Sequence, residues 1–174
     1  MKYNDFRPRL NGNKKIAYDY LTKKEKRILV IGDLHAPFTL EGYFEFCKDT
    51  YAKYNCNQVI FIGDIIDNHY SSFHTTDPDG MGGGDELDMA IDCIQEWIVA
   101  FPKADVCIGN HDRMIMRKAF ESQIPKRWIK SYNEVLGTNW RWGERFVYDG
   151  VQYVHGEGGT ARTKGKNDMR SERA

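Results

Sequence analysis

The sequence reads ILVIGD at residues 28–33 and returns to the same pattern as VIFIGD at residues 59–64. Each stretch is a short, uninterrupted run of β-favouring apolar residues, which is typical of a strand buried on both faces in a parallel sheet. A third run, residues 106–108, ends in Gly109-Asn110. Three strands that each end in glycine and then an oxygen-bearing side chain predict an α/β sheet with polar groups gathered at its carboxyl edge.

The segments between these runs have helical spacing. Apolar or aromatic residues recur at near-helical intervals over residues 41–54 and again over residues 85–100, where Asp85 is the expected N-cap and Pro102 ends the helix. The order strand, helix, strand, helix, strand follows the βαβ pattern with right-handed crossovers. Residues 68–84, dense in Gly, Ser, Thr, Asp and Pro, are expected to form a loop.

The second half of the chain predicts two more helices and a hairpin. We expect one helix over residues 114–121 and another from Pro125 to about Leu136. Residues 140–148 and 151–154 flank Asp149-Gly150, a strong turn signal between β-rich runs. Within the first arm, aromatic and basic residues alternate. This alternation fits base stacking, but it more often marks a half-buried strand with a charged outer face.

Composition excludes several classes of protein. The chain has 174 residues, of which 41% are hydrophobic and 29% charged, which is typical of a single globular domain. Its apolar runs are far shorter than the roughly 20 residues that span a bilayer, and no apolar leader follows Met1, so we expect neither a membrane protein nor an exported one. The four cysteines are widely spaced, which favours free thiols and a cytoplasmic location.

A net charge of zero hides a division along the chain. Residues 1–27 carry nine basic and three acidic side chains, and we interpret them as a basic N-terminal arm. Residues 28–156 are acidic and form the expected domain, and residues 157–174 form a polar tail. The arm fits contact with a phosphate backbone, although terminal Lys and Arg are usually just solvated. Concentrated carboxylates in the middle are the ligands that hard cations require.

The polar groups at the strand ends have the chemistry of a metal site. Asp33, Asp64 and Asn110 bring oxygens to one crevice, and three histidines fall at the same strand ends. Carboxylate, amide and imidazole groups together suit a borderline divalent cation. One of the histidines, His111, also adds a group suited to proton transfer.

Four motifs in order resemble those of the calcineurin-like metallophosphoesterases. They are DLH at 33–35, GDIID at 63–67, GNHD at 109–112 and VHG at 154–156, so the resemblance covers residues 28–156. It implies a layered α/β/β/α sandwich that hydrolyses phosphomonoesters or phosphodiesters through a dinuclear metal centre and a bridging hydroxide. The implied cofactors are two divalent ions, Mn, Fe or Zn, and the implied partner is a phosphate ester substrate.

The resemblance also implies metal ligands. By matching motifs, Asp33 and His35 bind one metal, Asp64 bridges the two, and Asn110 and His155 bind the second.

The resemblance gives two further residues, His111 and Asp67, roles near the phosphate. His111 lies close to the phosphate without binding metal and protonates the leaving oxygen, held by the carboxylate of Asp67, while Asn110 also faces the substrate. Arg113 is a candidate to bind phosphate with two guanidinium nitrogens. An equally good interpretation is that Arg113 is a solvated residue at the start of a helix.

The sequence departs from the family pattern in two places. Asn68-His69 follows Asp67 where the protein Ser/Thr phosphatase branch has Arg-Gly, which makes protein phosphatase activity less expected. No G-H-x-H follows His155, so we expect a domain truncated at its C-terminus whose metals each lack one imidazole, with lower metal affinity and turnover. The alternative function is a metal-binding or nucleic-acid-binding module with a poorly active site.

Overall fold

A four-stranded parallel sheet forms the centre of the protein in the computed structural model, which describes residues 26–72, 77 and 79–156. Its strands are β1 (Ile28–Ile31), β2 (Gln58–Phe61), β3 (Asp105–Cys107) and β4 (Arg141–Gly143), paired in that order. Most of the proposed basic arm at residues 1–27 and the whole polar tail at residues 157–174 lie outside the described residues.

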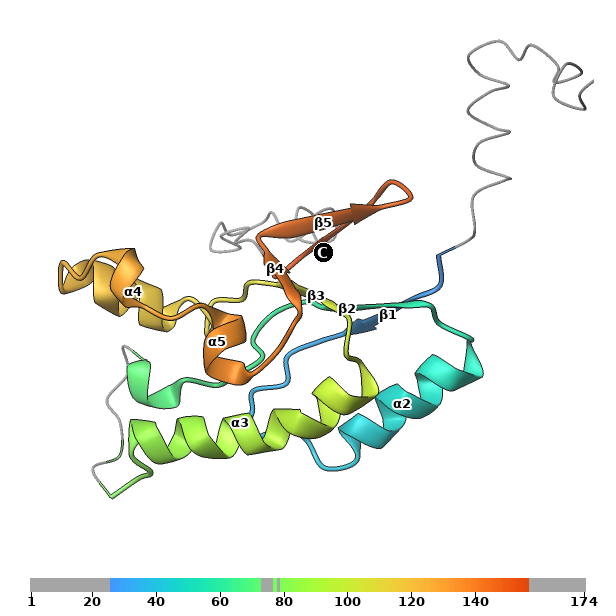
Figure 1. The fold of residues 1–174 in the computed structure, drawn as a ribbon. Coiled ribbons are helices and arrows are strands. Elements are labelled where there is room, and N and C mark those ends of the chain that lie inside the picture. The colour runs from blue at the N-terminus through green and yellow to red at the C-terminus, as the bar shows by residue number, and fades with distance from the viewer. Residues whose placement is uncertain (1–25, 73–76, 78, 157–174) are drawn as a thin grey trace, which may run out of the picture.

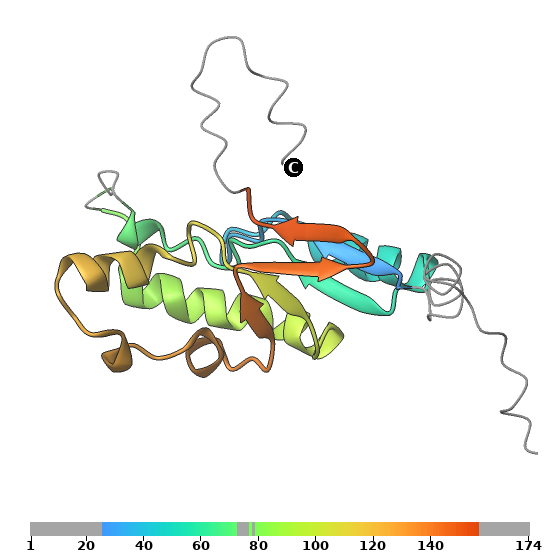
Figure 2. The same cartoon turned by 90° about the horizontal axis from the view of Figure 1, so that it is seen from above.

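Helices cover one face of this sheet and a hairpin covers the other (Figures 1 and 2). The covering helices are α2 (Tyr43–Lys53), α3 (Gly83–Ala100) and α5 (Tyr132–Leu136). Helix α4 (Met114–Glu121) lies to the side of the sheet, against the short 3-10 turns η2 (His69–Ser71) and η3 (Lys126–Trp128). The hairpin pairs β5 (Arg145–Tyr148) with β6 (Val151–Val154). Helices, parallel sheet and hairpin make up the layers of the α/β fold that the sequence predicted.

The alternating directions of strand side chains explain these layers. Phe61 and Val106 pack with Trp97 of α3 in the main core. Their sequence neighbours Ile60 and Cys107 point to the opposite face of the sheet and pack with the hairpin. All of these side chains are buried, so the central strands contribute to cores on both faces. The uninterrupted apolar runs in the sequence follow from that double burial.

The helix predicted from Pro125 to Leu136 is wrong in its extent. Residues 126–128 form a 3-10 turn, Ile129 is extended, and α5 begins only after Ser131. Ser131 and Glu134 form a capping box, in which each side chain receives the other residue's backbone N–H. This cap starts a new helix where the prediction continued the old one.

Two other boundaries differ from the prediction. The expected N-cap Asp85 lies inside the first turn of α3, because the helix begins at Gly83 with Gly82 as its N-cap. The single arm expected over residues 140–148 is two strands, β4 in the main sheet and β5 in the hairpin, separated by Glu144.

The alternation at residues 140–146 is that of packed strands. Trp140 and Phe146 are buried, and Arg141 pairs with Asp105 on β3. Rings buried in the core do not stack on bases, so this segment gives the nucleic-acid alternative no support. The turn at Asp149 and Gly150, both with positive φ, forms as predicted.

The described cysteines are free thiols, as expected, and Cys47 and Cys107 are buried. No helix within the described ranges has the combination of length and apolar character that a membrane span needs.

Candidate metal centre

The loops after β1, β2 and β3 and the end of β6 bring the predicted ligands together. Asp64 is at the centre of the group: its side chain is buried, and its Oδ2 lies 3.8 Å from His35 Nε2 and 3.3 Å from His155 Nε2. His155 Nε2 is also 2.8 Å from Asn110 Oδ1. Residues more than a hundred positions apart thus share one small volume, as parallel strand ends predict.

A hydrogen bond to the backbone fixes the orientation of the His155 ring. Its Nδ1 lies 2.7 Å from the carbonyl oxygen of Ile62, a group that only accepts, so Nδ1 carries the proton. When the ring is neutral, the lone pair of Nε2 faces the oxygens of Asp64 and Asn110. Three acceptors that point at one another repel unless a cation lies between them, which makes this arrangement suitable for a metal ion.

His35 is oriented in the same way by a carboxylate. Its Nδ1 lies 2.6 Å from Oδ1 of Asp67, which leaves Nε2 directed toward Asp64. A carboxylate behind a ligating imidazole raises the basicity of the free nitrogen and fixes the ring. The resemblance gave Asp67 the role of holding His111, but its carboxylate oxygen lies closer to His35 than to His111, whose Nδ1 is 3.5 Å away.

The backbone around Asp64 is shaped to present its carboxylate. Asp64 has φ 51° and His35 has φ 46°, left-handed conformations that non-glycine residues seldom adopt and that concentrate at functional sites. A Cβ on Gly109 would overlap the Oδ1 and backbone nitrogen of Asp64. Gly63, with φ 106°, leaves room for His155, because a Cβ there would lie 2.6 Å from His155 Nδ1. Close approach therefore requires glycine at positions 63 and 109.

Asp112 supports the site from inside, a role that the sequence prediction did not include. Its side chain is 1% exposed, and its two oxygens accept the backbone N–H groups of Asp64, Ile65 and Gly109 at 3.0, 3.1 and 2.8 Å. Burial raises the pKa of Asp112 to about 6, and these N–H donors act in the opposite direction. Its position as the last residue of GNHD was visible, but its backbone partners were not.

His111 lies beside the ligand group with one nitrogen free. Its Nδ1 contacts the carbonyl oxygen of Asp67, so Nδ1 carries a proton and Nε2 is the nitrogen available to a substrate. Its ring meets that of His35 edge-on at a centroid distance of 4.6 Å. Asn68 donates from Nδ2 to the His111 carbonyl at 3.0 Å and so fixes the backbone as well.

Glu86 is a second buried acid that the sequence prediction missed. Its side chain on α3 accepts the backbone N–H of His69 at 2.7 Å and that of Tyr70 at 3.3 Å. These bonds hold η2, which directly follows Asn68. No pattern in the sequence connects position 86 with positions 69 and 70.

Arg113 is paired with a residue outside the ligand group. Its guanidinium forms an ion pair with Glu144, the residue between β4 and β5, and both side chains are largely exposed. A phosphate grip by Arg113 therefore requires the exchange of Glu144 for substrate.

Two groups of side chains have the composition and spacing of cation sites. Asp33, Asp64 and His155 form one, and His35, Asp67 and His111 form the other, with candidate ligand atoms within 4.8 Å of one another in each. The resemblance placed Asp33 with His35, whereas the spacing places it with Asp64 and His155. Carboxylate oxygens and imidazole nitrogens fit borderline divalent ions such as Mn²⁺, Fe²⁺ and Zn²⁺.

Comparison with known proteins supplies the family. No curated protein and no solved structure gives a significant match to the chain. The model of the calcineurin-like phosphoesterase family matches residues 26–172, which include every ligand described above. Members of this family are in general metal-dependent phosphoester hydrolases. With a match over most of its length and the family's motifs gathered at one sheet edge, the chain belongs to the calcineurin-like phosphoesterase family.

Proposed function

We propose that this protein hydrolyses phosphate esters at a dinuclear metal centre. In this proposal the ligand sets follow the family's motifs: His35 and Asp64 hold one divalent cation, and Asp64, Asn110 and His155 hold the other. Asp33, which the motifs assign to the first cation, lies beside the ligands of the second. The observation that carries the proposal is the convergence on Asp64: two imidazoles, each with its Nδ1 directed at an acceptor, turn their Nε2 atoms toward the same carboxylate oxygen. A carboxylate between two imidazoles is suited to bridge a pair of cations.

Bound divalent cations supply Lewis acidity toward the phosphate oxygens and lower the pKa of a coordinated water toward neutrality. The protein's own residues do the rest. His35 and His155 are held rigid by Asp67 and the Ile62 carbonyl, so the ligands need little reorganisation when the ions bind.

His111 is the proposed proton donor to the leaving oxygen. Its Nδ1 is engaged by the Asp67 carbonyl, so the proton to be transferred resides on Nε2 of the imidazolium form. The Asp67 carboxylate, 3.5 Å from the ring, stabilises that positive charge. Asp67 thus serves both His35 and His111.

The test combines metal content with hydrolysis. The full chain is stripped with EDTA and reloaded separately with Mn²⁺, Fe²⁺ or Zn²⁺, and each form is assayed on an aryl phosphate monoester and a bis-aryl phosphodiester. We expect about two ions per chain and metal-dependent hydrolysis of at least one substrate. The relative rates on the two substrates establish whether monoesters or diesters are preferred.

Two variants separate binding from catalysis. Asp64→Asn is expected to lose both ions and all hydrolysis, because the bridging charge is gone. His111→Ala is expected to keep its metal and to lose about 10²-fold or more in kcat, as for removal of a general acid. Asp49→Asn, an exposed acid on α2, is the matched control. Full metal content with no hydrolysis of either ester would instead favour the binding-module alternative.

A further inference from the structure

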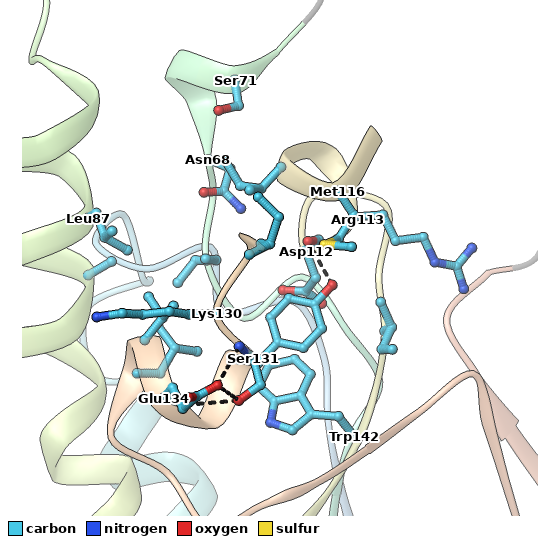
Figure 3. A pocket seen from close by; sticks show the side chains of 18 of the residues that line it. Asn68, Ser71, Leu87, Asp112, Arg113, Met116, Lys130, Ser131, Glu134 and Trp142 are labelled. Atoms are coloured by element: carbon cyan, nitrogen blue, oxygen red, sulfur yellow. Dashed lines mark hydrogen bonds between the residues drawn. The ribbon is translucent and has the colours of Figure 1, made fainter. Parts of the chain in front are cut away.

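A cavity of about 790 Å³ opens in the helical layer, between η2, α3, α4 and the η3–α5 segment (Figure 3). Apolar side chains form much of its wall, among them Ile66, Leu87, Ala90, Met116, Val135 and Trp142. Its volume is within the range that binds small organic molecules.

The cavity is separate from the candidate metal centre but shares a wall with it. Asn68, Asp112 and Arg113 line it, whereas His35, His111 and His155 do not. Tyr132, which also lines the cavity, donates its hydroxyl hydrogen to the Asp112 carbonyl at 3.0 Å. A molecule in the cavity therefore lies behind the metal-binding loops.

Aromatic rings give this wall a flat apolar surface. Tyr132 and Trp142 are stacked with centroids 4.3 Å apart and an interplanar angle of 24°. Tyr70 of η2 contributes a third aromatic side chain to the lining. Flat, partly buried rings of this kind favour a planar apolar partner over a flexible polar one.

Positive charge is concentrated on one side of the cavity. Lys126, Arg127 and Lys130 all line it, and none of the three forms an ion pair with another residue in the described part of the chain. Lys130 extends across the space toward Leu87 of α3 (Figure 3). The residue remains exposed to solvent, so its ammonium group is accessible to a ligand that enters the cavity.

The acidic side chains around the cavity are already engaged. Glu86 and Asp112 accept backbone N–H groups, and Glu144 is paired with Arg113. Glu134, the acid nearest in sequence to Lys130, is held by both the hydroxyl and the backbone of Ser131, and the charge of Lys130 also acts on it. Lys130 therefore shares its charge with one lining acid, and Lys126 and Arg127 complete a basic side of the cavity.

We propose that this cavity is a binding site for a small aromatic anion, distinct from the metal centre. The aromatic body packs against Trp142, Leu87 and Met116, and the anionic group meets Lys130. This combination matches the lining, with apolar walls that provide affinity and one charged group that orients the ligand.

The test uses two probes of nearly the same shape and different charge. They are 8-anilinonaphthalene-1-sulfonate, an aromatic anion, and N-phenyl-1-naphthylamine, its uncharged counterpart. We expect saturable fluorescence titration of the full chain by the sulfonate, with roughly tenfold weaker binding of the neutral probe, the size expected for the loss of one charge-assisted contact. Because the sulfonate is not a phosphoester, the result is independent of the proposed hydrolysis.

Three variants locate the site. Lys130→Met is expected to weaken the sulfonate about tenfold and to leave the neutral probe unchanged, since only the charge is removed. Leu87→Trp fills the cavity and is expected to weaken both probes. Lys118→Met, an exposed lysine of α4 outside the lining, is the control and is expected to change neither.

Circular dichroism and thermal unfolding establish that each variant is folded. Should Leu87→Trp fail to fold, the comparison of the two probes with Lys130→Met still decides the question. Sulfonate binding that does not saturate, or that Lys130→Met leaves unchanged, would overturn the proposal.

Discussion

Asp112 and Asp64 are joined through two adjacent loops. Asp112 Oδ2 accepts the backbone N–H of Asp64 at 3.0 Å, and Asp64 Oδ1 accepts the backbone N–H of His111, the residue before Asp112, at 2.8 Å. The loop after β2 and the loop after β3 are thus tied in both directions. A side chain that binds no substrate in the proposed mechanism fixes the position of the central carboxylate.

Replacing Asp112 with asparagine should disturb this link. One accepting oxygen becomes an NH₂ group that faces backbone N–H donors, so we expect the free energy of unfolding to fall by about 1–3 kcal/mol. Metal affinity should fall with it, because Asp64 is no longer held. Urea unfolding and metal titration measure the two effects. As a control, Asp92→Asn, which changes an exposed acid on α3, should alter neither quantity. If Asp112→Asn unfolds and binds metal like the unchanged protein, the link between the two loops is unimportant.

Two glycines offer a comparison of close approach with open space. At Gly109 an added Cβ overlaps Asp64, whereas at Gly84, in the first turn of α3, it meets nothing within 4 Å. We expect Gly109→Ala to displace the carboxylate and lower metal affinity. Gly84→Ala should stabilise the helix by up to about 1 kcal/mol and leave metal binding unchanged. Isothermal titration measures the metal affinity of both variants. Equal affinities would contradict the expectation that close packing at Gly109 positions the Asp64 carboxylate.

Asp105 should affect stability without affecting metal binding. This buried residue of β3 accepts hydrogen bonds from Arg141 Nε and Gln58 Nε2, both at 2.7 Å, and from the Tyr148 hydroxyl. Asp105→Asn is expected to cost about 1–3 kcal/mol of unfolding free energy, because donors then face a donor. The network connects β2, β3, β4 and β5 at the start of β3, whereas the ligands follow the strand ends. A parallel loss of metal affinity would therefore disagree with the structure.

Cys107 should report on the contact between sheet and hairpin. Its thiol lies under the hairpin, 3.4 Å from the Tyr153 carbonyl, and burial raises the pKa of Cys107 to about 11. Only the thiolate reacts with iodoacetamide, so about 0.1% of this group is reactive at pH 8. The alkylation rate should rise about tenfold per pH unit between pH 8 and 10. Mass spectrometry of the modified site follows the rate, and a plateau below pH 10 would contradict the raised pKa.

Glu144 should compete with substrate for Arg113. If Arg113 binds phosphate, Glu144→Gln frees its guanidinium, and we expect KM for an aryl phosphate to fall about threefold with kcat unchanged. Arg113→Gln should raise KM. The measurement is steady-state hydrolysis by the metal-loaded protein. Equal KM values in all three proteins would show that Arg113 is the solvated arginine of the alternative interpretation.

The sheet was predictable because each of its buried strands is marked by a short run of adjacent apolar residues. Runs such as residues 59–62 are apolar without alternation, which indicates burial on both faces, and their common ending in Gly and Asp or Asn marks one edge. The convergence of Asp64 and Asn110 followed from that topology, whereas His155, at the end of the hairpin strand β6, was assigned through the family resemblance. The capping pattern of Ser131 and Glu134 was equally visible in the sequence, and it identifies the start of α5 correctly.

Other features depend on partners that are remote in sequence. The alternation over residues 140–148 is continuous, so it does not reveal that β4 pairs with β3 and β5 with β6. The roles of Glu86 and Asp112 depend on backbone N–H groups of other segments.

The single residue between β4 and β5 limits how the hairpin, which carries His155, can move relative to the rest of the candidate metal centre. Since Glu144 alone links Gly143 to Arg145, the ends of the two strands stay within about 7 Å even when the hairpin lifts from the sheet. Such a movement would be a rotation about this hinge. It would carry His155 away from Asn110 while His35 and Asp67 stayed together. Of the two proposed cations, the one held by His155 would therefore dissociate first.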